Sequence, residues 1–200
     1  QQTMGKGRLG KNWSSPSSGN VYMSIYSKEL PKNIPLSLIV GLICVKTLNS
    51  MIKNDSIGLK WPNDMLLDKK KIGGILVEKE VMGQDINNIV GIGINLNHPE
   101  KEDWWGDLHK FGIHLRRDEL INKLLHSYIK FYDNGISDWQ ELWHKYCVHL
   151  NHEIEIKHNN NIINQGIFLG INADGSLNLK TKNNEEMKYE HGEISIEGIY

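Results

Sequence analysis

Arginine, cysteine, phenylalanine and alanine are scarce in this 200-residue chain, and long apolar runs are absent. No apolar stretch reaches the length needed to span a bilayer and no signal peptide is visible, so we expect no membrane partner. The two cysteines, Cys44 and Cys147, lie far apart in apolar or aromatic surroundings. We interpret them as buried or unreactive thiols, which fits a reducing compartment such as the cytoplasm.

Net charge is also nearly absent, because its formal value at pH 7 is −1. No global field therefore draws the protein to nucleic acid or membrane, and any anion must be bound locally. Twenty lysines accompany three arginines, and 21 asparagines and 25 isoleucines accompany one alanine. This skew weakens any argument from a single lysine or asparagine. The length suits one domain with a small appendage, and the initial Gln suggests that the chain begins inside a longer protein.

Glycine and positive charge are concentrated near the start, in residues 5–11 (GKGRLGK). Three glycines within six residues allow the backbone to turn sharply and to approach a ligand closely. Lys6, Arg8 and Lys11 place three cations on this loop, with no acidic residue before Glu29. Exposed N–H groups and cations together favour a phosphate or carboxylate ligand. The planar guanidinium of Arg8 adds to this prediction of an anion site.

The same residues also spell the G-x-G-x-x-G dinucleotide fingerprint, which we reject. That fingerprint needs an apolar strand before the loop and a helix directly after it. Only four residues precede this loop, and a run of turn-forming residues follows it at 12–19. A flexible basic terminus is the plain alternative, because a lone glycine-rich match is weak evidence.

Hydrophobic periodicity predicts strands and helices over residues 1–150. The expected strands cover residues 20–27, 57–61, 65–67, 72–81 and 89–96, and the expected helices cover residues 35–53, 118–132 and 137–150, with Asp118 and Ser137 as N-caps of the last two. Residues 98–110 show no clean period and predict a loop. After a boundary near residue 151, short strands and tight turns predict a small barrel.

Four segments place polar residues or glycines at strand ends or bends: residues 5–11, 60–64 (KWPND), 71–78 (KIGGILVE) and 91–95 (GIGIN). Each has a plain structural explanation when it is taken alone. WPND can be only a turn, the lysine of the KKK run can be solvated, and the glycines can mark a bulge or close packing. The ordered set is far more specific than any one member.

With these motifs, the sequence resembles the catalytic and C-terminal domains of the biotin–protein ligases, from Gln2 to the end of the chain. The resemblance implies an α+β fold of the class II synthetase-like type. A catalytic domain with a mixed sheet and helices would cover residues 1–150 and would be N-terminally incomplete. A small SH3-like β-barrel would cover residues 151–200.

The resemblance also implies a two-step reaction. Biotin would be activated by ATP with Mg²⁺ to biotinyl-5′-AMP and then transferred to a lysine of the biotin carboxyl carrier protein of acetyl-CoA carboxylase. Two anions must meet in the first step, which explains the cations of the motifs. The intermediate is prone to hydrolysis, so a loop that closes over it is useful.

The resemblance assigns roles to individual residues, with Lys71 and Arg8 as the catalytic pair. The residues implied to contact biotin or biotinyl-AMP are Gln2, Gly5, Lys6, Gly7, Arg8, Trp13, Lys71, Gly73, Gly74, Gly91 and Gly93. The residues implied to contact ATP are Lys11, Asn63, Asp64, Asn95 and Trp104, with Trp105 as an alternative cover for adenine. No metal site made by protein alone is implied, and Mg²⁺ would arrive with the nucleotide beside Asp64.

The sequence departs from the family pattern at Lys6 and Lys11, where the family usually has arginine. Lysine keeps the charge but loses the bidentate geometry. The family's Ser/Thr-rich biotin-binding segment would lie before Gln2. The winged-helix DNA-binding domain of its repressor members would also lie upstream, so a DNA partner is expected only if that domain exists. A homodimer is left open.

Two other functions were weighed. An octanoyl or lipoyl ligase or transferase on the related fold is disfavoured, because the glycine loop and KWPND are typical of the biotin branch. A nucleic-acid-binding module is disfavoured because residues 151–200 hold eight acidic residues and four lysines. His144, His149 and His152 lack a standard zinc spacing, and we expect exposed histidines at a helix end.

Overall fold

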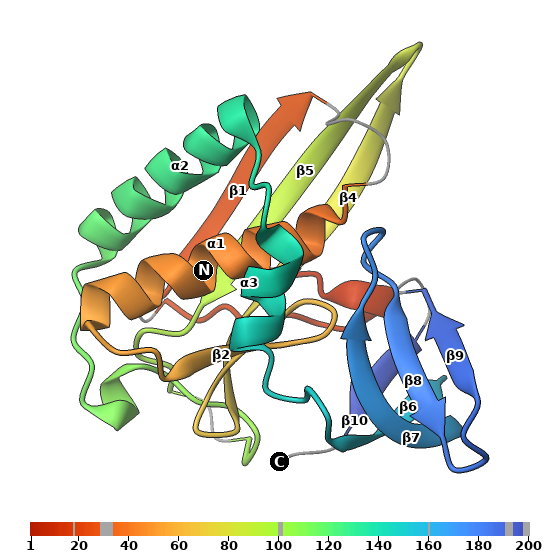
Figure 1. Cartoon of the computed structure of the whole chain (residues 1–200). Helices are drawn as coiled ribbons and strands as arrows, with labels where there is room; N and C mark the ends of the chain where they lie inside the picture. The colour runs from red at the N-terminus through yellow and green to blue at the C-terminus, as the bar shows by residue number, and fades with distance from the viewer. Residues whose placement is uncertain (18, 29–33, 100–101, 160, 191–193, 198–200) are drawn as a thin grey trace.

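The computed structural model describes residues 1–17, 19–28, 34–99, 102–159, 161–190 and 194–197 (Figure 1). The elements are a 3-10 turn Arg8–Gly10, β1 Val21–Lys28, α1 Leu36–Ile52, β2 Ile57–Lys60, β3 Asp64–Leu67, β4 Lys70–Met82, β5 Asp85–Ile94, a 3-10 turn His109–Phe111, α2 Arg117–Asn134, α3 Trp139–Tyr146, β6 Glu153–His158, β7 Asn161–Ile171, β8 Leu177–Thr181, β9 Glu186–Tyr189 and β10 Ile194–Glu197. In the described part of the chain, no helix is both long and apolar enough to cross a membrane.

The first sheet has the strand order β1-β5-β4-β3-β2. Its strand pairings are antiparallel, where the resemblance implied a mixed sheet. In the β4–β5 pair, Gly74 lies opposite Gly93 and Leu76 lies opposite Gly91. The glycines of two separate sequence motifs therefore meet at the centre of the sheet, where the backbone is open to a ligand or a bulky ring.

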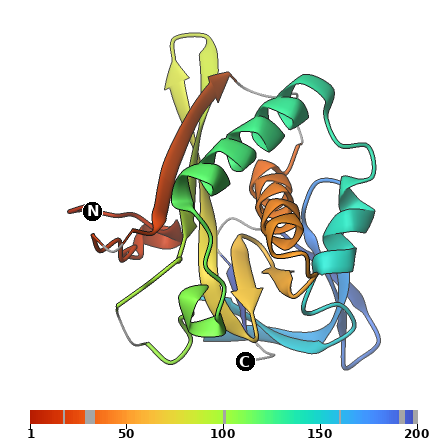
Figure 2. The same cartoon turned by 90° about the vertical axis from the view of Figure 1, so that its left-hand side faces the viewer.

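The helices pack against one face of this sheet, and the N-terminal segment lies on the other side (Figure 2). α1 is buried around most of its circumference, because it contacts α2, α3 and strands β2, β3 and β4. A helix that is apolar on every side belongs in a core, and α1 carries Leu, Ile and Val on all faces. The predicted helix at residues 35–53 is thus confirmed within one residue at each end.

The later helices differ in their ends from the prediction. Asp118 lies in the first turn of α2, and Arg116 occupies the N-cap position. α3 begins after Asp138, and not at Ser137, and it ends at Tyr146. Residues 147–150 leave the helix because the Val148 N–H donates to the Leu59 carbonyl at 3.0 Å, on the edge of β2. A tertiary backbone hydrogen bond thus ends the helix early.

The second sheet has the order β10-β6-β7-β8-β9, with antiparallel pairings throughout its described strands. Phe168, Ile154 and Leu179 are fully buried in it. The buried apolar residues of both sheets form one continuous core. The mixture of helices and sheets confirms the predicted α+β class, whereas the domain boundary near residue 151 and the SH3-like character of the second sheet stay predictions.

Candidate active site

Residues 5–13, here called the N-terminal hairpin, carry the cationic glycine motif. The Gly7 N–H donates to the Lys11 carbonyl at 2.6 Å, and the Trp13 N–H donates to the Gly5 carbonyl at 2.9 Å. Leu9, at the tip, has a left-handed backbone with φ 55°. The cations therefore stand on a hydrogen-bonded hairpin, which argues against the alternative of a flexible basic terminus.

Trp13 fixes this hairpin to the glycines of the sheet. A Cβ added at Gly93 would lie 2.8 Å from Trp13 Cε2, and one added at Gly74 would lie 3.4 Å from Trp13 Cζ3. The first distance is too short for a real contact, so any side chain at Gly93 would displace the indole ring. Gly93 is therefore required by the close approach of Trp13 to the strand backbone.

Lys71 and Asp64 form an ion pair at the centre of the site. Lys71 Nζ lies 2.7 Å from Asp64 Oδ1, and each side chain is 19% exposed. The ammonium also lies 5.6 Å from the Trp13 ring and 6.0 Å from the Trp104 ring. Burial lowers the pKa of the Arg8 guanidinium, and the charge of Asp64 opposes this effect. A cationic centre with one carboxylate and aromatic walls suits an anion with an apolar body.

The KWPND motif is fastened to β4 by its asparagine. Asn63 Nδ2 donates to the Ile75 carbonyl at 2.8 Å, and the Ile75 N–H donates to the Asn63 carbonyl at 2.9 Å. The Trp61–Pro62 peptide bond is cis. These contacts hold the following residue, Asp64, within reach of Lys71 on the neighbouring strand.

The loop that carries Trp104 and Trp105 is hydrogen-bonded to the backbone of Lys71. The Lys71 N–H donates to the Trp104 carbonyl at 2.9 Å, and the Gly106 N–H donates to the Lys71 carbonyl at 2.9 Å. Asn95 Nδ2 donates to the Gly106 carbonyl at 3.0 Å, whereas Asn95 Oδ1 is buried without a protein partner. Trp104 and Trp105 meet edge to face at 5.1 Å. An acceptor and an aromatic surface thus lie together at this end of the site.

These elements enclose a cavity of about 700 Å³. The predicted site residues that line it are Gln2, Lys6, Gly7, Arg8, Lys11, Trp13, Asn63, Asp64, Lys71, Gly74, Gly91, Gly93, Asn95, Trp104 and Trp105. Four sequence motifs that are far apart in the chain therefore converge on one pocket. Its size is within the range of pockets that hold small ligands and cofactors.

Gly5 and Gly73 do not line the cavity. A Cβ at Gly5 would overlap the Trp13 carbonyl within the hairpin, so this glycine serves the turn itself. A Cβ at Gly73 would lie 2.5 Å from the Gly93 carbonyl and 2.6 Å from Met65 Cε. The structure thus gives both glycines a packing role, and their ligand contacts stay predictions.

Several lining residues escaped the sequence argument. Tyr22 and Ser24 on β1 line the cavity, as do Glu78 and His98. His98 is 4% exposed and packs edge to face on Trp105 at 5.2 Å. The alternation of β1 places residues 22 and 24 on one face, but no motif marks that face as the ligand side.

Carboxylates are few around the cavity, which bears on metal binding. Among the described residues, no group of three or more His, Cys, Asp or Glu is placed to hold a metal ion. Asp64 is already paired with Lys71. Mg²⁺ often uses one or two carboxylates together with substrate phosphates, and this donor set fits that mode only.

His149 is buried and His144 is half-buried, contrary to prediction, whereas His152 is exposed as predicted. His149 is 1% exposed, and burial lowers its pKa to about 3. His144 Nε2 accepts the Ile171 N–H at 2.9 Å, and burial lowers the pKa of His144. Both rings pack between α3 and the second sheet because that sheet docks on the helix. His144 is therefore a structural hydrogen-bond acceptor.

The fold is of the class II synthetase-like type that its structural neighbours share. A model of the Biotin/lipoate A/B protein ligase family matches residues 1–95. The structure is similar to the biotin protein ligase of Aquifex aeolicus in complex with biotin and ATP, with a TM-score of 0.80 and 27% identity over 98% of this chain and 85% of that one. In sequence and in structure, the chain is similar to the biotin–protein ligases.

Curated relatives include the bifunctional ligase/repressor BirA of Escherichia coli, which is 31% identical over 90% of this chain. The biotin–protein ligase of Homo sapiens is 31% identical over 78% of this chain and 24% of its own length. The chain spans 59% of the length of the Escherichia coli relative.

Proposed function

We propose that the protein activates biotin with ATP to give biotinyl-5′-AMP and pyrophosphate, and then transfers biotin to a lysine of a biotin carboxyl carrier protein. The observation that carries this proposal is the convergence of Lys71, Asp64 and Arg8 in one glycine-floored cavity. The solved relative that was captured with biotin and ATP supports the pair of substrates.

The first step brings a carboxylate to a phosphate, so repulsion between two anions must be cancelled. Lys71 is held by Asp64 at the cavity centre and is the residue that we propose to bridge the biotin carboxylate and the α-phosphate. Fixed cations stabilise the charge that develops on the α-phosphate without reorganisation of solvent. Holding two reactants in line can itself contribute about 7–11 kcal/mol.

The N-terminal hairpin is the part that we propose to retain the intermediate. Arg8 would bind the acyl-phosphate, and Gln2, Lys6 and Gly7 would contact biotin or close over it. Trp13, Gly74, Gly91 and Gly93 would form an apolar floor for the biotin rings. Enclosure matters because water destroys the mixed anhydride.

The opposite end is the proposed nucleotide site. Lys11, Asn63 and Asp64 would organise the phosphates and Mg²⁺, and Asn95 and Trp104 would bind the base. Mg²⁺ supplies charge neutralisation on the phosphates when it is bound. The buried Asn95 Oδ1 needs a donor, which the ligand would provide.

The partners that we propose are biotin, ATP with Mg²⁺ and the carrier domain of acetyl-CoA carboxylase. The free thiols of Cys44 and Cys147 are consistent with a cytoplasmic location, and burial raises the pKa of each to about 12. DNA binding would need a winged-helix domain in the full protein, and a homodimer stays open.

Transfer to an acceptor tests this proposal. The full-length protein is incubated with biotin, ATP, Mg²⁺ and a purified biotin carboxyl carrier domain, and the acceptor is weighed by mass spectrometry. We expect one added biotinyl group, and none on an acceptor whose target lysine is arginine. Modification with octanoate or lipoate instead would place the protein on the lipoyl branch, and no modification by folded protein would reject the function.

A further inference from the structure

Trp61, in the middle of the KWPND motif, is tied to the second sheet. Its side chain is 1% exposed, and its indole N–H donates to the Gly175 carbonyl at 3.0 Å. Gly175 belongs to the turn between β7 and β8, 114 residues further along the chain. A buried indole N–H needs an acceptor, so the position of Trp61 depends on the position of this turn.

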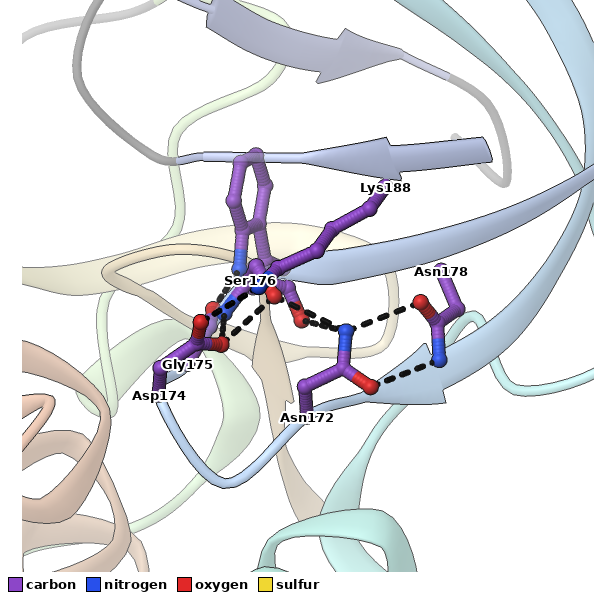
Figure 3. A network of polar contacts seen from close by, with 7 residues as sticks. Asn172, Asp174, Gly175, Ser176, Asn178 and Lys188 are labelled. Atoms are coloured by element: carbon purple, nitrogen blue, oxygen red, sulfur yellow. Dashed lines mark hydrogen bonds and ion pairs between the residues drawn. The ribbon is translucent and has the colours of Figure 1, made fainter. Parts of the chain in front are cut away.

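Hydrogen bonds and an ion pair cross-link the turn at residues 172–176, here called the β7–β8 turn (Figure 3). Asn172 and Asn178 exchange side-chain amide hydrogen bonds at 2.8 and 2.9 Å. Asp174 Oδ1 accepts the Ser176 hydroxyl at 2.6 Å and the Ser176 N–H at 3.0 Å. Lys188 Nζ lies 2.6 Å from Asp174 Oδ2. The Lys188 and Ser176 hydrogen bonds lower the pKa of Asp174, so its carboxylate stays charged near neutral pH.

The turn also fits tightly against the start of α1. Gly175 has a left-handed backbone with φ 84°, and a Cβ there would overlap Pro35 and lie 3.1 Å from Leu38 Cδ1. Ser37, on the same helix, donates its hydroxyl to the Pro62 carbonyl at 3.3 Å. The turn and α1 therefore hold the Trp61–Pro62 segment from two sides.

The other end of this segment reaches the reacting centre. Asn63 is bonded to Ile75 of β4, and Asp64 is paired with Lys71 at 2.7 Å. Asp64 is only three positions after Trp61 in the chain, so a shift of the indole would move the carboxylate that holds the lysine. A misplacement of about 1 Å in an active site can cost about 100-fold in rate.

We propose that the β7–β8 turn is a positioning element for the adenylation step, with Gly175 acting through Trp61 on Asp64 and Lys71. The second sheet thereby sets the rate of biotin activation from outside the cavity, since no residue of the turn lines it. This inference rests on the proposed function. The competing explanation is that the turn only stabilises the fold.

A double-mutant cycle separates these explanations. Trp61→Phe removes the donor but keeps an aromatic ring, and Asp174→Ala loosens the turn by removing the acceptor of Ser176 and the partner of Lys188. Each change, made in the full-length protein, should lower kcat for biotin-dependent pyrophosphate exchange by roughly 10- to 100-fold. If the turn acts through Trp61, Asp174→Ala should have little further effect in the Trp61→Phe background.

Two matched variants sharpen the cycle. Glu153→Ala is the control, because Glu153 is also an exposed carboxylate paired with a lysine, Lys182 just after β8, but lies outside the β7–β8 turn. It should leave kcat unchanged. Asp174→Asn keeps an oxygen acceptor for Ser176 and should restore most of the kcat that Asp174→Ala loses. Biotin affinity, measured by calorimetry, should change less than about twofold in the turn variants, since the floor of the biotin pocket is untouched.

The proposal would be overturned if the two losses in kcat multiply independently in the double mutant. It would also be overturned if kcat falls only in those variants whose melting temperature falls. Asp174→Ala alone, compared with Asp174→Asn, keeps the test available if Trp61→Phe does not fold. A lower kcat at unchanged melting temperature then supports positioning, and an unchanged kcat rejects it. Absence of exchange in the unmodified protein would instead reject the proposed function itself.

Discussion

Lys71 Nζ lies 2.7 Å from Asp64 Oδ1, and the two residues belong to the neighbouring strands β4 and β3. The register of these strands shifts between Met65 and Leu66, so that Asp64 lies opposite Gly74 and Leu66 lies opposite Lys71. The bulge brings the lysine and the carboxylate to the same side of the cavity. Lys71 is thus fixed and charge-balanced before any anion enters.

The role of Lys71 can be tested by removing its charge. Lys71→Ala should abolish most adenylate formation, by at least about 100-fold, because the developing charge on the α-phosphate loses a fixed cation. Biotin-dependent pyrophosphate exchange measures this step. Lys69→Ala, in the adjacent exposed turn, is the matched control and should retain activity. Equal activity of the two variants would remove Lys71 from the chemistry.

The proposed retention of the intermediate by Arg8 can be tested by removing its side chain. Arg8→Gly should let biotinyl-AMP escape, so that lysines of a bystander protein become biotinylated in proportion to time. Arg116→Gly is the control, since Arg116 is exposed and pairs only locally with Asp118. Blotting of albumin added to the reaction reports the leakage. Labelling that is no greater for Arg8→Gly than for Arg116→Gly would count against the clamp.

The packing of Trp13 on the sheet predicts that alanine substitutions at Gly93 and Gly91 affect biotin binding to different degrees. Gly93→Ala should displace the Trp13 ring and raise the KM for biotin by roughly tenfold or more, because a Cβ there would lie 2.8 Å from Trp13 Cε2. Gly91→Ala meets nothing nearer than the Leu76 carbonyl at 3.6 Å and should be milder. Initial rates over a range of biotin concentrations compare the two. A larger effect at Gly91 would contradict the packing of Trp13.

The sequence predicted those parts of the site that are local in the chain. The strands expected at residues 72–81 and 89–96 correspond to β4 and β5, and the expected turn in KWPND separates β2 from β3, because turn formers and alternation are written in a few residues each. The hairpin at residues 5–13 and the pairing of the two glycine strands were not predicted. α1 was also predictable, since its apolar residues recur at helical spacing over five turns.

The remainder depends on contacts between distant segments. The Trp61–Gly175 hydrogen bond joins residues 114 positions apart, and no local pattern announces it. α3 ends early because Val148 bonds to Leu59. His149 looked like a helix-end surface residue, but the docking of the second sheet buries it against Phe168, with the rings 5.8 Å apart. Tertiary packing overrode local propensity in each case.

Burial of His149 makes stability depend on pH. Its pKa is about 3 in the folded protein against an ordinary value of 6.5, chiefly through burial, with Lys60 and His152 acting in the same direction. The unfolded chain therefore binds more protons below pH 6.5, and the free energy of unfolding falls as the pH drops from 6.5 towards 3. The loss should reach about 2 kcal/mol at pH 5.

Urea unfolding between pH 8 and pH 5 measures this dependence. His149→Phe should flatten the slope whatever its effect on stability at pH 8, because the titrating group is gone. His126→Gln, at an exposed position of α2, should leave the slope close to that of the unmodified protein. An unchanged slope in His149→Phe would show that other groups carry the dependence.

The most direct test of the central claim is biotin-dependent exchange of labelled pyrophosphate into ATP by the full-length protein. Exchange reports reversible adenylate formation without any acceptor. The cavity formed by the N-terminal hairpin, KWPND and the β4–β5 glycines predicts exchange that requires biotin and Mg²⁺ and that is not supported by octanoate or lipoate. A folded protein that shows no exchange with biotin, or equal exchange with octanoate, would contradict it.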